Sequence, residues 1–273
     1  MAPDRSETVS LYMPLVPSDQ DGLALDSRFT FQCHADLPCF NQCCRTPTII
    51  LSPYDLLRLK ECLGITSGKL LQRYTRQEID QESHLPLVFI DPHRTAAGGC
   101  PFLGAGGCTV YAHRPAACRL FPITMGSRLT PRGVEDYYFC RKLDYCRGFL
   151  ADTEWTVESW QANQGFVEYD QGRREWLEIL LKAGLEESGA VNAQAQDLFA
   201  TLAYDLDRFR TLLLEPAFLQ AYEVDARAVT YLQTDDLALL KLSYRVLQSV
   251  LSSEGVRVLT AIIRSSTKFF QMD

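Results

Sequence analysis

The feature that most constrains this chain is the distribution of its cysteines. All ten lie between Cys33 and Cys146, and the remainder of the 273-residue chain contains none. The first four form the pattern Cys33-x5-Cys39-x3-Cys43-Cys44, and the others are Cys62, Cys100, Cys108, Cys118, Cys140 and Cys146. Thiols placed by chance would not stop at residue 146. We therefore predict that the first half of the chain is built around sulfur chemistry, with a metal centre as its favoured form.

Composition indicates in which compartment the thiols lie and which partners the protein could bind. The chain is 47% hydrophobic and 22% charged, as is typical of a soluble globular protein. No apolar run reaches the roughly 18 residues that a bilayer span needs, and the N-terminal segment lacks the apolar core of an export signal. We expect a cytoplasmic protein without a membrane partner, in a compartment where stable disulfides are rare. The net charge of −7 and the lack of a basic stripe argue against nucleic acid as a partner.

The residue pattern divides the chain into three parts. Residues 1–27 are predicted to be a partly disordered lead-in, residues 28–150 a cysteine-cluster metal-binding domain, and residues 151–273 a C-terminal helical domain. The predicted fold class is α-rich α+β, in which an irregular cysteine-rich domain is followed by an all-α domain.

Local signals mark several elements within these parts. Ser52 as N-cap, Pro53 at the first helical position and Gly64 as a stop predict a helix with a leucine face. Ser67 is expected to cap a second helix, and Pro115 to start a short helical turn near Cys118. Strands are predicted at 85–90 and 137–139, and helices from apolar stripes at 176–181, 198–213, 237–251 (capped by Thr234) and 256–263.

Four kinds of cysteine chemistry compete. Structural disulfides need an oxidising compartment, and a redox dithiol enzyme needs a Cys-x-x-Cys motif that this chain lacks. Structural zinc sites pair their ligands across two to four residues, and only Cys39-x3-Cys43 comes near that spacing. Iron–sulfur clusters accept thiolates from several loops. The spacing therefore favours an iron–sulfur centre, with 4Fe-4S as the expected form, over zinc as the alternative.

Two cysteine positions carry further information. In an extended backbone, neighbouring side chains point to opposite faces. Cys43 and Cys44 are therefore expected to serve two centres, or one of them to stay free. Cys62 lies in the leucine-rich helix and is expected to be a buried core thiol. The remaining nine cysteines form the predicted ligand pool, which is enough for one or two four-thiolate clusters.

Arginine follows a cysteine directly at four places, which is notable in an acidic chain. A cluster held by four thiolates is anionic, and guanidinium groups nearby would offset its charge. We therefore predict that Arg45, Arg114 and Arg119 contact the cofactor, with ordinary surface charge as the alternative reading. Histidine is a common metal ligand, but the surplus of cysteines favours a surface or hydrogen-bonding role for His113.

Five sequence blocks now resemble one known family. They are Phe31-x-Cys33 with Cys39 and Cys43-Cys44, the run Leu51 to Leu59, Cys100-Pro101-Phe102-Leu103, Cys108 to Pro115 (CTVYAHRP), and Cys118-Arg119-x-Phe121-Pro122. Over about residues 29–148 the chain resembles the YkgJ-like cysteine-cluster family, a zinc- or iron-chelating domain named for a CxxCxxCC signature. Here five and three residues intervene in the first block, where that signature has two and two.

The resemblance implies metal chelation. It extends more distantly to flagellin lysine-N-methylase, which has a similar cysteine arrangement and implies an iron–sulfur protein that uses S-adenosylmethionine. Two function classes stay open. In one, the centre transfers electrons or modifies a protein partner in a methyltransferase-like reaction. In the other, zinc only folds an interaction module, and the protein has no catalytic activity. The substrate or protein partner is not indicated by the sequence.

Overall fold

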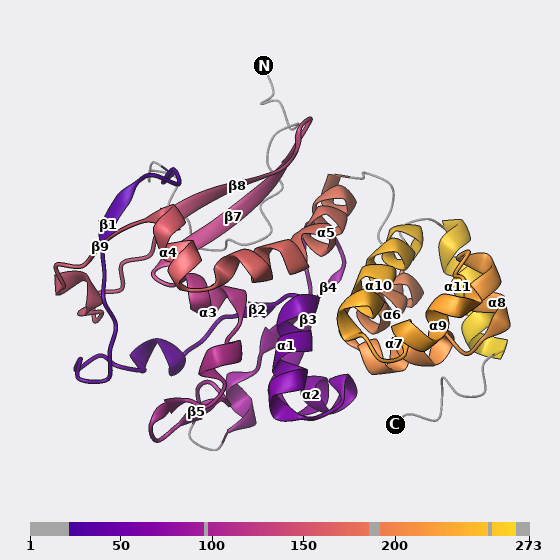
Figure 1. Cartoon of the computed structure of the whole chain (residues 1–273), viewed down its shortest axis with the longest axis horizontal. Coiled ribbons are helices and arrows are strands. Elements are labelled where there is room, and N and C mark those ends of the chain that lie inside the picture. Colours follow the sequence, from indigo (N-terminus) through magenta and orange to yellow (C-terminus); the bar gives the residue numbers. More distant parts are fainter. Residues whose placement is uncertain (1–21, 96–97, 186–191, 251–252, 266–273) are drawn as a thin grey trace. The chain divides into compact units, whose positions relative to one another are not determined.

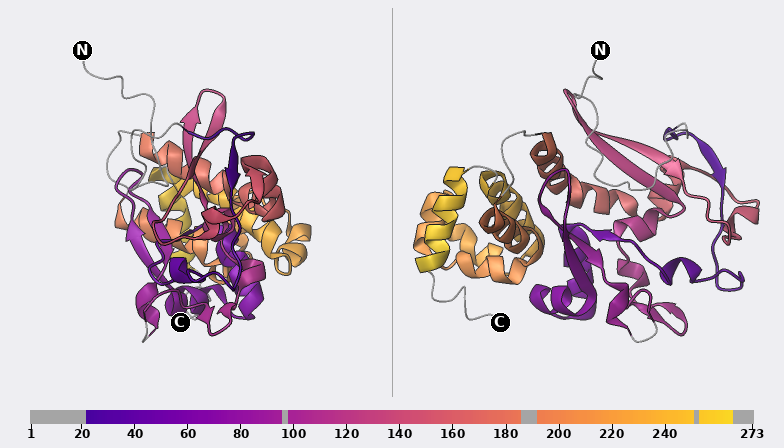
Figure 2. Two further views of the ribbon diagram at one scale, coloured as in Figure 1. Left: turned by 90° about the vertical axis from the view of Figure 1, so that its left-hand side faces the viewer. Right: turned by 180° about the vertical axis from the view of Figure 1, so that it is seen from behind.

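The computed structural model describes residues 22–95, 98–185, 192–250 and 253–265. Its elements make an α-rich α+β protein, as predicted, with many helices and four small sheets (Figures 1 and 2). None of the described helices has the length and apolar character needed to cross a membrane. Most of the predicted lead-in at 1–27 lies outside the described residues.

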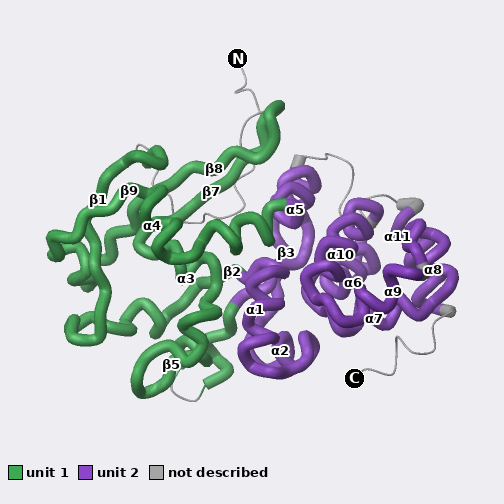
Figure 3. The backbone as a smooth tube through the Cα atoms, in the orientation of Figure 1, with its two compact units in different colours: residues 1–50, 90–174 green, residues 51–89, 175–273 purple. Residues whose placement is uncertain are grey.

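The chain forms two compact units that are discontinuous in sequence (Figure 3). Unit 1 comprises residues 1–50 and 90–174, and unit 2 comprises residues 51–89 and 175–273. The sequence predicted contiguous domains that meet at residue 150. The units differ from that division because residues 51–89, which lie inside the predicted metal domain, belong with the C-terminal helices.

Unit 1 consists of short elements joined by loops. Strand β1 pairs with β9, β5 with β6 and β7 with β8, each pair antiparallel. The bounds are β1 Arg28–Thr30, η1 Gln42–Cys44, η2 Pro92–Arg94, β5 Leu103–Gly104, β6 Gly107–Cys108, η3 Tyr111–His113, α3 Ala116–Leu120, β7 Ile123–Thr130, β8 Gly133–Cys140, η4 Gly148–Leu150, β9 Glu154–Thr156 and α4 Val157–Asn163, where η marks a 3-10 helix.

An aromatic cluster forms the core of unit 1. Phe31 is buried and makes edge-to-face contacts with Phe121, Phe149 and Trp160, at centroid distances of 5.8, 5.2 and 5.6 Å. The indole nitrogen of Trp160 donates a hydrogen bond to the carbonyl of Leu120 at 2.9 Å. Such pairs add to the burial of apolar area. Phe31 thus anchors the backbone two residues before the first cysteine.

Three elements contain the points at which the chain passes between the units. These are β2 Ile50–Leu51, β4 Pro86–Ile90 and α5 Phe166–Leu185. Strand β4 lies in the centre of a three-stranded sheet of order β2-β4-β3. The strand predicted at 85–90 is therefore confirmed as β4, and all five residues of β4 are buried, as expected of a central strand.

Unit 2 consists mainly of helices. Their bounds, with the remaining strand, are α1 Pro53–Leu63, α2 Ser67–Tyr74, β3 Thr75–Ile79, α6 Ala193–Tyr204, α7 Leu206–Leu212, α8 Pro216–Ala221, α9 Ala226–Leu232, α10 Asp236–Val250 and α11 Ser253–Ser265. The core includes Leu59, Trp176 and Leu240, none of which exposes surface. From residue 193 to residue 265, the described elements are all helices, as predicted.

Helix α1 follows its sequence signals closely. The Ser52 hydroxyl accepts a hydrogen bond from the Asp55 backbone amide, and the Asp55 carboxylate accepts one from the Ser52 amide at 2.8 Å, which completes a capping box. Gly64 ends the helix with φ of 62°, a left-handed conformation that glycine adopts without a Cβ clash. Each of these signals acts within a few residues, so the sequence alone predicted this helix.

Other element predictions need correction. The N-cap of α2 is Thr66, whose side chain accepts a hydrogen bond from the Lys69 amide. The Ser67 hydroxyl instead donates to the carboxylates of Asp205, the N-cap of α7, and Asp207. Asp235, and not Thr234, accepts the first-turn hydrogen bond of α10, from Ala238 at 2.8 Å. The single helix predicted over 198–213 is two helices, which are divided at Asp205. The predicted strand at 137–139 is only part of the longer β8.

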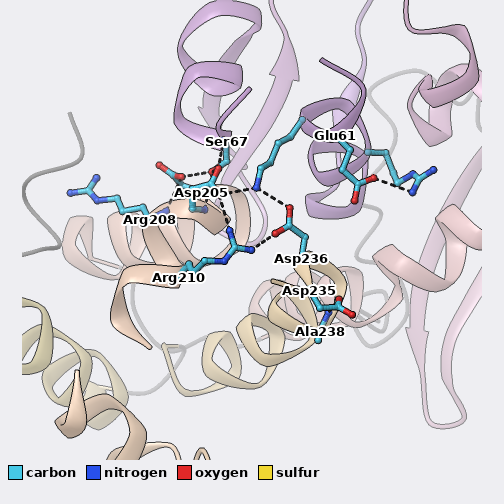
Figure 4. Close-up of polar contacts among 11 residues, drawn as sticks. Glu61, Ser67, Asp205, Arg208, Arg210, Asp235, Asp236 and Ala238 are labelled. Carbon is cyan, nitrogen blue, oxygen red and sulfur yellow. Dashed lines mark hydrogen bonds and ion pairs between the residues drawn. The ribbon is translucent and has the colours of Figure 1, made fainter. Parts of the chain in front are cut away.

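A charged network joins α1 and α2 to the later helices within unit 2 (Figure 4). The Lys60 ammonium donates to the carboxylates of Asp207 and Asp236, each at 2.8 Å. Arg210 donates to the same two carboxylates, at 2.9 Å in the case of Asp207. The Ser67 backbone amide donates to Asp207 at 2.7 Å. This network explains in part why residues 51–89 pack with the C-terminal helices.

Candidate metal centre

All ten cysteines are free thiols, and the nine predicted ligands lie in unit 1. Cys62 is the exception, because α1 belongs to unit 2. The prediction that Cys62 is a buried core thiol is wrong, since its side chain is exposed. It occupies the last turn of α1, beside the exposed residue Glu61. The division into units therefore separates Cys62 from the ligand pool.

One set of thiols, here called the N-terminal thiol group, comprises Cys33, Cys39, Cys43 and Cys146. The backbone amide of Arg147 donates a hydrogen bond to the Cys39 sulfur at 3.2 Å. Partial burial and negative charge on Cys43, Cys39 and Cys146 together raise the pKa of Cys33 to about 11. These four thiols are thus near enough to feel one another's charge.

Backbone pairing brings the two ends of this group together. The amide of Phe31 donates to the carbonyl of Thr153, and that of Gln32 to the carbonyl of Gly148, both at 3.0 Å. Strands β1 and β9 pair next to these bonds, with Phe29 opposite Trp155. The segment that enters Cys33 therefore runs along the segment that leaves Cys146, although more than a hundred residues separate them in sequence.

The other set, here called the loop thiol group, comprises Cys44, Cys100, Cys108 and Cys118. The Cys100 amide donates to the Cys44 carbonyl at 2.8 Å. Gly99 has φ of 90°, and a Cβ atom there would lie 3.1 Å from the Cys44 carbonyl oxygen, so the close approach of the two segments favours glycine. Cys108 lies opposite Leu103 in the β5–β6 pair, and Cys118 lies on α3.

Electrostatic coupling also links the members of the loop thiol group. Burial raises the pKa of Cys100, and negative charge on Cys108 and Cys43 adds to the shift. The pKa of Cys44 is raised because its thiol proton is held by Cys43 and because the thiol is buried, with the charges of Cys100 and Cys118 adding to these effects. Without a metal, burial and the hydrogen bond to Cys43, together with nearby negative charge, therefore favour neutral thiols at Cys44 and Cys100.

The adjacent pair Cys43 and Cys44 joins the two groups. Both residues lie in the 3-10 helix η1, and their sulfur atoms are 4.0 Å apart. The extended backbone assumed from the sequence is wrong here. Four sulfurs around a zinc ion lie about 3.8 Å apart, as expected from zinc–sulfur bonds of about 2.3 Å, so these two sulfurs could share one ion. A hydrogen bond from Cys44 lowers the pKa of Cys43 to about 7.

Cys140 lies at the margin of the N-terminal thiol group. It ends β8, opposite Ile123 of β7. Burial raises the pKa of Cys140, the Lys142 ammonium lowers it, and the negative charge of Cys146 raises it. Cys146 is thus the thiol whose charge acts on Cys140. The two groups of four and Cys140 together make up the nine predicted ligands.

The donor chemistry fits a thiolate-bound metal, although the side chains do not stand in a ligating arrangement. Among the described residues, no three His, Cys, Asp or Glu side chains are placed to hold a metal ion. Nine thiols within one unit nevertheless provide the donor type that zinc and iron–sulfur clusters take. Ligation would require the thiols to lose their protons and to turn toward a common centre.

Arg119 uses its side chain to hold the backbone around Cys118. Its guanidinium is buried and donates to the carbonyls of Arg114 at 3.0 Å, of Gln164 at 2.8 Å and of Ala112. It also lies over the ring of Tyr169, 4.2 Å from the centroid. These contacts support a positioning role for Arg119. Sequence reasoning missed Tyr169, because no motif connects residues 50 positions apart.

Arg114 and Arg45 differ in their surroundings. Arg114 donates to the Tyr111 carbonyl and to the Gln164 side chain, at 2.8 and 2.6 Å. Burial lowers the pKa of Arg114, while negative charge on Tyr111, Cys118 and Cys108 acts to raise it, so Arg114 is electrostatically coupled to the loop thiol group. Arg45 is exposed beside Cys44. Arg114 therefore remains the better-supported cofactor contact of the predicted three.

His113 carries an unsatisfied nitrogen near the loop thiol group in sequence. Its Nδ1 atom is buried and has no hydrogen-bond partner in the described part of the chain. A buried polar atom without a partner costs free energy. The hydrogen-bonding role expected from the sequence is thus not seen for this atom, and Nδ1 is available to a group that the structure does not contain.

The arrangement of thiols can now be compared with known families. Residues 32–147 match the family model described as "CxxCxxCC: Putative zinc- or iron-chelating domain". The resemblance to a zinc- or iron-chelating domain is thereby confirmed, whereas the more distant similarity to flagellin lysine-N-methylase stays a prediction. This CxxCxxCC segment spans all nine predicted ligands and also covers residues 51–89 of unit 2. No curated protein and no solved structure matches the chain. Metal chelation is thus the function that the comparison supports.

Proposed function

We propose that unit 1 holds an iron–sulfur centre through its cysteine thiolates. The observation that carries this is that nine free thiols lie in unit 1 and interact electrostatically in two sets, one around Cys33 and one around Cys44, which share Cys43. Four thiolates are the ordinary ligand set of a 4Fe-4S cluster, and clusters accept ligands from irregularly spaced loops. The N-terminal and loop thiol groups would each hold one cluster, with Cys140 in reserve.

The chain's own residues would tune such a centre. Arg114 supplies positive charge near Cys108 and Cys118, which offsets the negative charge of the thiolates. Arg119 donates to the backbone carbonyls of Ala112 and Gln164 and so holds these two segments near Cys118. When bound, an iron–sulfur cluster supplies one-electron redox chemistry, with a potential set by nearby charges, hydrogen bonds and solvent exposure.

Metal analysis under anaerobic conditions tests the proposal. Protein purified without oxygen should be brown, absorb broadly near 400 nm, and contain about four or eight iron atoms per chain with matching sulfide. Cys118→Ser should lose the iron of the cluster in the loop thiol group, about four atoms, and stability together. Cys62→Ser is the matched control, because Cys62 is exposed in unit 2, and it should keep the iron. A colourless protein with stoichiometric zinc after anaerobic reconstitution would exclude the cluster.

Structural zinc is the second candidate, and one observation favours it. The 4.0 Å separation of the Cys43 and Cys44 sulfurs suits a shared tetrahedral ion. In this case the metal folds unit 1, and the domain acts as an interaction module without catalysis. Zinc removal would unfold unit 1, and the zinc protein would show no reduction wave in voltammetry, because zinc has no redox chemistry.

We propose a redox or methyltransferase-like role for the iron–sulfur form. The distant similarity of the cysteine arrangement to that of flagellin lysine-N-methylase motivates the second option, by analogy alone. Titration of the anaerobic protein with S-adenosylmethionine separates the two roles. Saturable binding with a change in the cluster's spectrum supports methyl transfer. A reversible reduction without such binding supports electron transfer to a protein partner.

A further inference from the structure

A shallow cavity of about 650 Å³, largely open to solvent, lies in unit 1 beside the N-terminal thiol group. Gln32 and His34, which flank Cys33, line it, as do Pro38, which precedes Cys39, and Arg147, which follows Cys146. The volume is within the range of about 300–1,000 Å³ typical of small-molecule sites. The cavity is therefore bordered by the neighbours of three of the group's four cysteines.

Two charged side chains in the lining lack an ion-pair partner. Arg147 and Asp152 are both exposed, and within the described residues neither side chain forms an ion pair with the other or with a third group. His34, by contrast, lies 3.6 Å from the Asp36 carboxylate. The cavity thus presents one positive and one negative group that are separate and unneutralised.

The other lining groups divide into a polar and an apolar wall. Gln32 and Thr153 hydrogen bond to each other through their side chains at 3.3 Å, so they are already engaged. Leu37, Pro38 and Leu150 supply apolar surface, and Leu150 is 76% exposed. An apolar ligand group could cover part of this surface and gain free energy from its burial.

We propose that this cavity binds a free α-amino acid with an aliphatic side chain. Its carboxylate would pair with the Arg147 guanidinium, its ammonium group with the Asp152 carboxylate, and its side chain would cover Leu150. Arginine suits a carboxylate because its planar donors can bind both oxygens. The binding itself does not require a metal. Only the placement of the amino acid beside a metal centre rests on the proposed function.

Calorimetric titration of the full chain with L-leucine tests the proposal. L-Leucine should bind saturably. 3-Methylbutylamine lacks its carboxylate and 4-methylpentanoate lacks its amine, so each should bind about tenfold more weakly or not at all, because each loses one charge-assisted contact. No saturable binding of L-leucine up to about 10 mM, or equal binding of either analogue, would overturn the proposal.

Matched variants locate the binding. Arg147→Gln and Asp152→Asn should each weaken L-leucine binding about tenfold. Arg132→Gln and Asp26→Asn change exposed residues outside the cavity and should leave it unchanged. Thermal melts of each variant check that it is folded. Equal weakening of L-leucine binding in the two control variants would overturn the proposal. Metal analysis of the same samples tests the proposed function separately, since a metal-free chain can bind leucine and a metal-loaded chain can fail to.

Discussion

Unit 2 packs apolar side chains from long helices, whereas the thiol-bearing segments of unit 1 lie in loops and short elements. Leu59, Trp176 and Leu240 of unit 2 expose no surface. In unit 1, Cys33 and Cys43 are exposed, and of the nine predicted ligands only Cys39 is buried. Buried apolar side chains therefore hold the helices of unit 2. The more exposed loops that carry the thiols in unit 1 would gain stability from the proposed metal.

Metal removal should affect the two units most unequally. Structural metal sites can contribute about 10 kcal/mol or more to folding. We therefore expect chelation to release amide protection throughout the thiol-bearing loops of unit 1, while the helices α6 and α10 of unit 2 stay protected. Hydrogen exchange measured by mass spectrometry on the loaded and chelated protein checks this. Unchanged protection near Cys100 and Cys118 after complete metal loss would break the comparison.

Arg119→Met should come next in effect. The variant leaves three backbone carbonyls without their donor near Cys118, and we expect a loss of about 3 kcal/mol in the free energy of unfolding. Metal affinity should fall about 10- to 100-fold, as for other residues that position ligands. Competition with a chelator measures the affinity. Arg128→Met is the control, because Arg128 is 46% exposed and its pair with Glu135 is worth little.

Lys60→Met tests how much the buried ion pairs of unit 2 contribute to stability, independently of any metal. It leaves the carboxylates of Asp207 and Asp236 with one cation fewer in a site where the Lys60 side chain is only 13% exposed. We expect a loss of about 2–3 kcal/mol, measured by urea unfolding, with metal content unchanged. Lys182→Met, which removes an exposed pair with Glu178, is the control. Loss of metal in Lys60→Met would mean that the units do not respond independently.

The same network predicts a pH dependence for unit 2. Burial acts to raise the pKa of Asp207, but hydrogen bonds from Lys60 and the Ser67 amide outweigh it and hold the pKa below its ordinary value. The charged form is thus favoured by folding. Its contribution is present above about pH 4, the ordinary aspartate value, and is lost as the pH falls through the lowered pKa. Urea unfolding of Asp207→Asn should show a weaker acid dependence than that of the natural chain.

The smallest effect concerns reactivity within unit 1. In metal-free protein the pKa of Cys43 is lowered to about 7 by the Cys44 hydrogen bond, whereas burial and neighbouring thiolates raise that of Cys33 to about 11. The thiolate is the reactive form. Iodoacetamide at neutral pH should therefore modify Cys43 well before Cys33, although both are exposed. Peptide mapping measures the order, and faster labelling of Cys33 would contradict the assignment.

Local signals were predictable, and contacts between distant segments were not. The capping box and Gly64 of α1 act within one helix, so sequence reasoning found both ends. Ser67 also resembled a cap, but its hydroxyl bonds Asp205, which is 138 residues away and could not be anticipated. The site shows the same limit. The ligand pool was visible as a list of cysteines, whereas the groups into which they sort depend on contacts such as that of Cys44 with Cys100.

Residue type and short spacing were enough to predict the resemblance to a zinc- or iron-chelating domain, the pool of nine cysteines and the helical character of the later residues. Contacts across the fold were needed to assign Cys62 to a different unit from the other nine cysteines and to group residues 51–89 with the C-terminal helices. They were also needed to show that the Arg119 side chain binds backbone carbonyls. The fold also places a cavity beside Cys33 and Cys146. The physical reason is that each of these outcomes depends on which segments pair across a long loop, and pairing of this kind leaves no local pattern in the chain.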